Sequence, residues 1–279
     1  MTKAGNRYRA FVRFPSSGRW RYGIRLGRHD QFVGSLLVRP AVPVLQQPHG
    51  IVQESDGKLL VADFRANAVF RLDPLTGEGS TVVRVPGPRD IRRSPDGKLL
   101  VSSGLNVLEL DAAARTTRVM VRGAGPLEGI APAADGSVYV VEDQARIVRI
   151  RRDGLRSVLA QGLNGVHGIL GTADGVIVCE SFAGNVRLLS ESGMRTLASG
   201  LGNPSSAAEA PGGFYVTEFS AGRLSLLTRS GDVTPIASVA SPGPVALDAS
   251  GRPLVGTIDG RIVRVDPGTG RVTQLWPRR

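Results

Sequence analysis

The chain has 279 residues, of which 41% are apolar and 5% aromatic, and it carries a formal net charge of +11. The length allows two ordinary domains or one longer repeat architecture, and the apolar content is ample for a folded core. The single cysteine, Cys179, excludes an internal disulfide and follows an apolar run, so we expect it to be buried. No apolar stretch approaches the roughly 20 residues that a membrane-spanning helix needs.

The basic charge is concentrated at the N-terminus. Residues 1–40 hold nine lysines and arginines against one acid, Asp30, whereas the other 239 residues hold 26 basic and 23 acidic side chains. The segment lacks the uninterrupted apolar stretch of a secretory signal, so we expect a cytoplasmic protein. It also lacks the repeat described below, and we predict a basic extension over residues 1–47.

The extension contains two short runs that predict a β-hairpin. Residues 9–14 and 19–26 flank the turn sequence Pro15-Ser16-Ser17-Gly18, and apolar residues alternate with arginines in the second run. This period of two indicates one packed face. We expect the hairpin to pack on the rest of the protein with its arginines in solvent, and residues 34–38 to form a further strand near the point where the repeats close.

From Pro48 to Leu275 the sequence repeats six times. Tight-turn pairs fall at residues 56–57, 96–97, 135–136, 174–175, 212–213 and 250–251, which gives periods of 40, 39, 39, 38 and 38 residues. Each repeat holds four short apolar runs with no helical period, so each predicts four strands. Units of this kind close into a ring in a β-propeller. We therefore predict an all-β, six-bladed β-propeller of four-stranded blades over residues 48–279, with the N-terminal hairpin as an extension. Because repeat six has its own fourth strand at residues 272–276, a strand borrowed from the N-terminus is not required.

Polar residues recur at two positions of the repeat. In a propeller the innermost strand begins and the second strand ends near the central channel, because the two strands are antiparallel. Aligning the repeats on their turns places at the first position His49, Arg89, Glu128, His167, Ser205 and Gly243. The second position holds Asp63, Ser103, Glu142, Glu180, Glu218 and Thr257. We expect both sets to meet around one axis and to form a site at the mouth of the channel.

Five carboxylates and two imidazoles in a narrow channel repel one another unless a cation or protons intervene. A divalent metal is the natural solution, either Mg²⁺ or Ca²⁺, with Mn²⁺ and Zn²⁺ as alternatives. The candidate metal ligands are Asp63, Glu128, Glu142, Glu180 and Glu218. The candidate catalytic residues are His167, His49 and Arg89. The two histidines lie three blades apart and face each other across the channel. The alternative is a water-filled channel with salt bridges such as Arg89 to Asp63.

Several segments also carry a family resemblance. They are residues 48–51 (Pro-His-Gly-Ile), 94–101 (Ser-Pro-Asp-Gly-Lys-Leu-Leu-Val), 215–218 (Tyr-Val-Thr-Glu) and 265–270 (Val-Asp-Pro-Gly-Thr-Gly). They resemble the repeats of streptogramin lyases (virginiamycin B lyase), of the senescence marker protein/gluconolactonase group and of NHL-repeat propellers. The first likeness implies elimination that opens a cyclic depsipeptide with the help of Mg²⁺. It makes His167 the general base or acid, and Glu180 and Glu218 the ion-binding or orienting carboxylates. Repeats two and six depart from the pattern, with Ser103 and Thr257 in place of acids.

Together these observations predict an enzyme with a small-molecule substrate. We expect a divalent-metal-dependent lyase, or a lactone or ester hydrolase, acting on a small polar or cyclic molecule at the channel mouth. A lyase needs a base to remove a proton next to a carbonyl and a cation to hold the enolate, whereas a lactonase polarises the carbonyl and activates water. We expect a monomer or weak oligomer without membrane contact.

The alternative is a non-catalytic NHL-type scaffold for protein or RNA. The N-terminal hairpin interleaves aromatic residues with arginines, a mixture that nucleic-acid binding favours. Against this, the alternation puts the aromatics and the arginines on opposite faces. Salt-dependent RNA affinity that is lost on deleting residues 1–33 would support this alternative.

Overall fold

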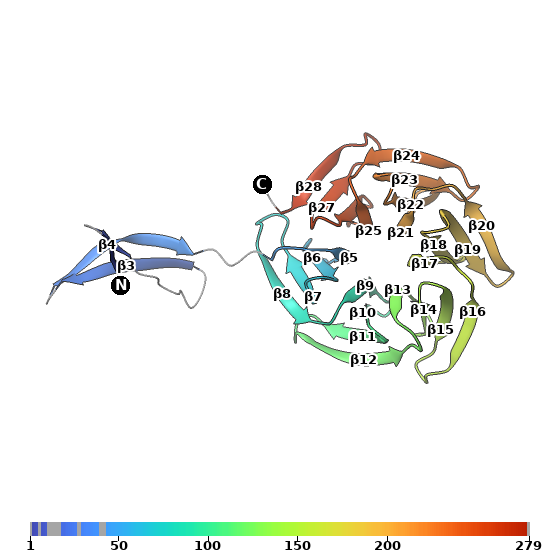
Figure 1. The fold of residues 1–279 in the computed structure, drawn as a ribbon, viewed down its shortest axis with the longest axis horizontal. Coiled ribbons are helices and arrows are strands. Elements are labelled where there is room, and N and C mark those ends of the chain that lie inside the picture. The colour runs from blue at the N-terminus through green and yellow to red at the C-terminus, as the bar shows by residue number, and fades with distance from the viewer. Residues whose placement is uncertain (1, 5–6, 10–17, 27–28, 39–42, 278–279) are drawn as a thin grey trace. The chain divides into compact units, whose positions relative to one another are not determined.

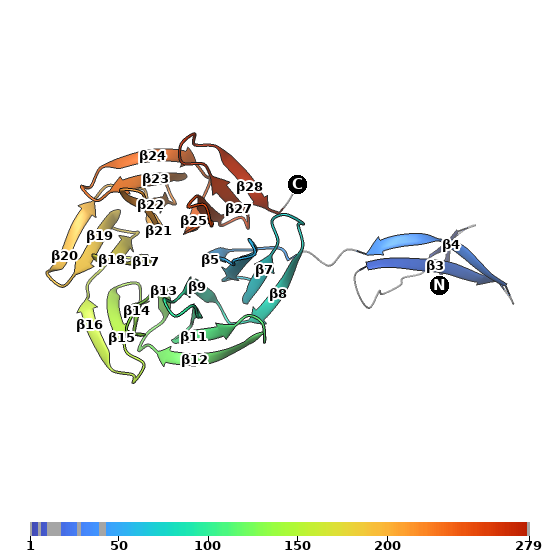
Figure 2. The same ribbon diagram turned by 180° about the vertical axis from the view of Figure 1, so that it is seen from behind.

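The computed structural model describes residues 2–4, 7–9, 18–26, 29–38 and 43–277, and the chain divides into two compact units, residues 1–42 and 43–279. The second unit is a six-bladed β-propeller, as predicted (Figures 1 and 2). Each blade is an antiparallel sheet of four strands that follow one another in the sequence. Within the described ranges there is no helix that is long and apolar enough to cross a membrane.

The blades run in chain order around the ring, each from its innermost to its outermost strand. Blades 1 to 3 contain β5 (Pro48–Gln53), β6 (Leu59–Asp63), β7 (Ala68–Leu72), β8 (Gly79–Arg84), β9 (Pro88–Arg93), β10 (Leu99–Ser103), β11 (Asn106–Asp111), β12 (Thr116–Arg122), β13 (Leu127–Pro132), β14 (Val138–Glu142), β15 (Arg146–Ile150) and β16 (Arg156–Ala160). Blades 4 to 6 contain β17 (Val166–Thr172), β18 (Gly175–Glu180), β19 (Asn185–Ser190), β20 (Gly193–Ala198), β21 (Pro204–Ala210), β22 (Gly213–Glu218), β23 (Arg223–Thr228), β24 (Val233–Ser238), β25 (Pro242–Leu247), β26 (Pro253–Thr257), β27 (Ile262–Val265) and β28 (Val272–Trp276).

The tight turns that set the repeat have the geometry that their sequence predicts. In the first, the Asp56 carboxylate accepts a hydrogen bond from the backbone N–H of Lys58 at 3.1 Å, and Gly57 has φ 85°. Residues other than glycine rarely adopt such a φ, so the Asp-Gly pair fixes where strand β5 ends and β6 begins.

The core consists of apolar clusters between neighbouring blades, and one of them closes the ring. In that cluster Trp276 of β28 and Ile262 of β27 pack with Ile51 of β5 and with Leu45. Blade 6 supplies all four of its own strands, so ring closure depends on this packing and on the contact of β25 with β5. Cys179 is fully buried, as predicted, and burial raises the pKa of its thiol to about 12.

The first unit contains two small antiparallel sheets. Strand β1 (Thr2–Ala4) pairs with β2 (Arg7–Arg9), and β3 (Gly18–Leu26) pairs with β4 (His29–Val38). The second run is therefore part of a β-hairpin, and the structure pairs it with the strand that follows it. The predicted first arm, residues 9–14, lies almost entirely outside the described residues. Residues 34–38 form part of β4. The packing of the hairpin and the RNA-binding alternative depend on side chains outside the described set and stay predictions.

Candidate functional site

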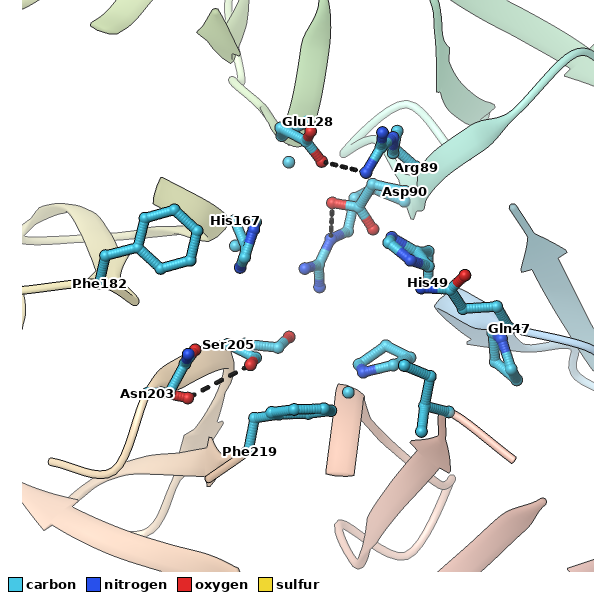
Figure 3. Close-up of a pocket in the computed structure, with 18 residues that line it drawn as sticks. Gln47, His49, Arg89, Asp90, Glu128, His167, Phe182, Asn203, Ser205 and Phe219 are labelled. Carbon is cyan, nitrogen blue, oxygen red and sulfur yellow. Dashed lines mark hydrogen bonds and ion pairs between the residues drawn. The ribbon is translucent and has the colours of Figure 1, made fainter. Parts of the chain in front are cut away.

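All six first-position residues line one cavity, as the repeat alignment predicts. The cavity has a volume of about 320 Å³ and opens where the six innermost strands begin (Figure 3). In every blade the strand register shifts at this residue, for example between Pro48 and Gly50 in blade 1 and between Val166 and Ile169 in blade 4. Such a bulge redirects a side chain without disturbing the strand on either side of it. The bulge thus presents His49 and His167 to the cavity.

A glycine follows three of these residues because the innermost strands approach one another closely. A Cβ at Gly168 would lie 2.5 Å from the carbonyl oxygen of Ser205, and one at Gly129 would lie 2.7 Å from that of His167. Real Cβ atoms essentially never come so near, so these positions exclude any side chain. The His-Gly and Glu-Gly pairs of the sequence therefore combine a cavity residue with a close contact between blades.

His167 is held in one orientation by a hydrogen-bond chain. The Ser181 hydroxyl donates to the carbonyl oxygen of Pro204 at 2.6 Å, and it lies 3.0 Å from Nδ1 of His167. Because a hydroxyl has one proton, Ser181 accepts the hydrogen bond from Nδ1–H. The neutral ring therefore carries its lone pair on Nε2, the nitrogen that a general base uses. Burial, and then the charge of Arg89, lower the pKa of His167, which keeps the ring neutral.

Arg89 stands between His49 and Glu128 at the rim of the cavity (Figure 3). Its Nη1 lies 3.2 Å from Oε2 of Glu128, and its guanidinium carbon lies 3.9 Å from the centre of the Phe64 ring. His49 also contacts Phe64, with the ring centres 5.3 Å apart. Burial is the main cause that lowers the pKa of His49 to about 4, and Arg89 and His167 add to the effect. Burial raises the pKa of Glu128.

The sequence interpretation missed a second Arg–carboxylate pair, which lies on strand β9 together with Arg89. Asp90 and Arg92 line the cavity, and Arg92 Nε lies 3.0 Å from Oδ2 of Asp90. Asp90 also accepts hydrogen bonds from the backbone N–H groups of Ile91, at 2.8 Å, and of Ile130 in blade 3, at 3.1 Å. Burial raises the pKa of Asp90. The pair joins two neighbouring innermost strands and adds a second guanidinium to the cavity.

Three apolar side chains form part of the cavity wall and were also missed. Phe182 is 60% exposed and Ile258 is 39% exposed, and Phe219 lies with them in the lining. The Phe182 ring meets the His167 ring edge-on at 5.6 Å and fills the space that a Cβ on Gly165 would need. Phe219 and Ile258 directly follow the second-position residues of blades 5 and 6, so the repeat alignment held a signal for them.

The second-position residues lie away from this cavity, so the expectation that both sets meet there is wrong. In four blades the carboxylate instead binds a backbone N–H of the loop that leads into its own innermost strand. The bonds run to Asp63 from Gln46 (2.7 Å), to Glu142 from Ala124 (2.9 Å), to Glu180 from Asn164 (2.8 Å) and to Glu218 from Gly202 (2.9 Å). The Ser103 hydroxyl holds the equivalent loop through the carbonyl oxygen of Pro86 at 2.5 Å. Thr257 bonds within its own turn.

Arginines also form ion pairs with three of these carboxylates. The ion pairs join Arg146 and Arg156 to Glu142, Arg187 to Glu180, and Arg223 to Glu218. The predicted salt bridge from Arg89 to Asp63 does not form, because Arg89 pairs with Glu128 and Asp63 with backbone N–H groups. We call Asp63, Ser103, Glu142, Glu180 and Glu218 the loop latches, since each fastens a loop between blades.

The structure offers no ready metal centre in the part of the chain that it describes. No group of three or more His, Cys, Asp or Glu residues there has the arrangement needed to hold an ion. Of the five predicted ligands only Glu128 lines the cavity, and it already pairs with Arg89. As arranged in the described part of the chain, the cavity residues do not form a divalent-metal site, so the chemistry below depends on none. Metal binding stays a prediction.

Comparison with known proteins shows the fold. No protein-family model and no curated protein sequence matches the chain. Among solved structures, a catalytically inactive histidine-to-alanine variant of virginiamycin B lyase from Staphylococcus aureus with quinupristin is 15% identical, with a TM-score of 0.64 over 92% of this chain and 88% of that chain. A gluconolactonase from Xanthomonas campestris is 13% identical (TM-score 0.67; 77% and 84%), and a chain of the nidogen/laminin complex is 15% identical (TM-score 0.65; 74% and 89%). The resemblance to this group of six-bladed propellers is confirmed at the level of the fold.

Proposed function

We propose that the chain is an enzyme that opens an ester or lactone bond in a small, partly apolar molecule, with His167 as the general base. The observation that supports this most directly is the hydrogen-bond chain from His167 through Ser181 to Pro204, which leaves Nε2 of a neutral imidazole at the cavity. A base needs both the tautomer and the neutral state.

The rest of the cavity supplies what base catalysis on an ester requires. When the base removes a proton next to the carbonyl, or from an attacking water, negative charge develops on the carbonyl oxygen, and a preorganised cation stabilises it. Arg89 and Arg92 both line the cavity and provide such charge without a metal. Phe182, Phe219 and Ile258 offer an apolar wall to the body of the substrate.

Two bond-breaking routes fit this arrangement. In an elimination, His167 takes the proton from the carbon next to a carbonyl, a double bond forms, and the ester oxygen leaves as part of a carboxylate. In a hydrolysis, His167 takes a proton from water, whose oxygen adds to the ester carbonyl. The acyl C–O bond then breaks, and His167 returns the proton to the leaving oxygen, so that a carboxylic acid and an alcohol result. The fold neighbours include proteins of both kinds, a virginiamycin B lyase and a gluconolactonase, which supports the reaction class and does not choose between the routes.

The products distinguish the routes. We would incubate the protein with quinupristin, as a cyclic ester open to elimination, and with dihydrocoumarin, as an aromatic lactone open to hydrolysis. Elimination leaves the mass unchanged and creates a double bond that absorbs in the ultraviolet, whereas hydrolysis adds the mass of water. Replacing His167 by Gln should lower the rate about 100-fold or more, the usual contribution of a general base.

His29→Gln is the matched control, because it removes an imidazole from strand β4, in the other unit of the chain. It should leave the rate unchanged. A wild-type protein that opens neither compound, or a His167→Gln variant that remains as active as the control, would contradict the proposed function.

A further inference from the structure

Arg89 has hydrogen-bond donors that the protein does not use. A guanidinium carries five N–H donors in a rigid fork. Among the described residues, Arg89 forms a single ion pair, to Glu128 at 3.2 Å, and otherwise rests on the face of Phe64. Arg92 commits its Nε to Asp90 and forms no other ion pair within the same described set. The cavity therefore contains two guanidinium groups with capacity for a further anionic partner.

The carboxylates of the cavity cannot be that partner, since their oxygens are already engaged. Asp90 accepts hydrogen bonds from Ile91, Ile130 and Arg92. Glu128 accepts one from the Gln144 side-chain amide at 3.1 Å in addition to its pair with Arg89. What remains unused at the two guanidinium groups is donor capacity, so the ligand that complements them is an acceptor, ideally a charged one.

Two neutral histidines share the cavity with Arg89 of blade 2: His49 comes from the neighbouring blade 1, and His167 comes from blade 4. The charged and titratable groups that line the cavity come from four of the six innermost strands: His49 from β5, Arg89, Asp90 and Arg92 from β9, Glu128 from β13, and His167 from β17. Strands β21 and β25 place the uncharged Ser205 and Gly243 there. The positive charge of Arg89 helps to keep both imidazoles neutral. An anion that offsets this charge would favour protonation of a histidine.

We infer that the channel mouth binds a carboxylate through Arg89, with an aromatic or other ring-shaped apolar body against Phe182 and Phe219, and that binding transfers a proton from solvent to one of the two histidines. The inference rests on the proposed function only for the source of the ligand, because ester opening by either route releases a carboxylate in the cavity. Such a product is then also an inhibitor. The apolar part of the site follows from Phe182, which is 60% exposed and lines the cavity (Figure 3).

Isothermal titration calorimetry with benzoate tests the binding, and benzamide is the neutral compound of the same shape. Benzoate should bind about tenfold or more tightly than benzamide at pH 6, which is the advantage expected of a charge-assisted hydrogen bond. If binding takes up a proton, the observed binding enthalpy should differ between a phosphate buffer and an amine buffer, because the two buffers have different enthalpies of ionisation. The double variant His49→Gln, His167→Gln should bind benzoate without this buffer dependence.

The variants assign the contact. Arg89→Gln should remove the preference for benzoate over benzamide, whereas Arg93→Gln, an exposed arginine on the same strand, should keep it. Equal affinities for the two compounds in the wild type, or an unchanged preference in Arg89→Gln, would overturn the inference. If Arg89→Gln proves unfolded by its thermal transition, the comparison of benzoate with benzamide and the buffer dependence in the wild type still decide.

The outcome is separable from that of the proposed function. A protein that prefers benzoate and takes up a proton but opens neither quinupristin nor dihydrocoumarin is a carboxylate-binding propeller, and only the enzymatic proposal fails. A protein that opens an ester yet shows no preference for benzoate keeps the enzymatic proposal and loses this inference.

Discussion

Replacing Glu218 by Gln should destabilise the propeller while leaving the cavity lining intact. The Glu218 side chain has no exposed surface (0%), and its oxygens accept hydrogen bonds from Arg223 Nε (2.6 Å), Ser225 Oγ (2.6 Å) and the backbone N–H of Gly202 (2.9 Å). A glutamine can accept at one oxygen only, and its amide group brings N–H donors up against other donors. Breaking a buried ion pair costs about 3–5 kcal/mol. Because Arg223 is 37% exposed and water can solvate it, we expect a loss at or below the lower end of this range, about 2–3 kcal/mol.

Thermal and urea unfolding at pH 7 measure this loss. For a protein of this size the melting temperature should fall by roughly 5–10 °C. Glu209→Gln, which removes the same charge from an exposed position on strand β21, should change it little. The measurement is repeated with EDTA. Substituting a loop latch should cost the same stability with or without divalent metal, whereas substituting a metal ligand should cost stability only when the metal is present. A loss within about 0.5 kcal/mol of the control, or a loss that appears only without EDTA, would refute the latch interpretation.

The pH dependence of the same difference has a defined sign. Burial acts to raise the pKa of Glu218, but the hydrogen bonds from Arg223, Ser225 and Gly202 outweigh it and hold the pKa below its usual value. A group whose pKa is lower in the folded protein stabilises it fully above the unfolded pKa, and this stabilisation is lost as the pH falls through the folded pKa. The gap between wild type and Glu218→Gln should therefore shrink under acidic conditions.

Three further predictions concern the cavity. Ser181→Ala removes the partner that fixes the tautomer of His167, so the rate of ester opening should fall about tenfold. Phe182→Leu keeps the hydrogen-bond chain and should alter substrate affinity more than the rate. A Ser181→Ala variant as fast as wild type would show that Ser181 does not hold the tautomer. Gly168→Ala puts a Cβ 2.5 Å from a backbone oxygen and should cost about 1–3 kcal/mol of unfolding free energy, whereas Gly171→Ala on the same strand meets nothing nearer than 3.6 Å and should be close to neutral. The pKa of His49 falls from 6.5 to about 4 on folding, so the unfolded chain takes up a proton at a higher pH than the folded protein does. As the pH falls from 6.5 to about 4, the free energy of unfolding should therefore decrease in the wild type, and it should decrease less in His49→Gln.

The number and order of the blades could be predicted because the information is local. Each Asp-Gly turn fixes where two strands meet, as at Asp56 and Gly57, and the apolar runs between the turns have the length of single strands. The partner of residues 19–26 could not be read in the same way. Segments on both sides of that run were suited to pair with it, and its pairing with residues 29–38 depends on side-chain packing that alternation alone does not encode.

Only one of the two sets of residues in the candidate site could be placed from the sequence. The first-position residues share a cavity because the alignment of the repeats is correct, and His49 and His167 are among its members. The second-position residues were misplaced by one residue of register. The alignment implied that His49 lies opposite Asp63, but the bulge places Pro48 opposite Asp63 instead. A shift of one residue turns a side chain to the other face of a strand, and a bulge has no reliable signature in a single sequence.

This register difference separates two roles in five of the six repeats. A bulge residue such as His49 or Glu128 sits where the ladder is interrupted, so its side chain can change without loss of a strand contact. A latch residue such as Glu142 or Glu218 holds the loop between blades, and only an acceptor or hydroxyl group serves there. The six bulge positions are therefore where the chemistry of the channel mouth is determined, and the latches are where the ring is held. On this reasoning, substitutions at His49, Arg89, Glu128 and His167 should change ligand choice at nearly constant stability, while substitutions at the latches should do the reverse.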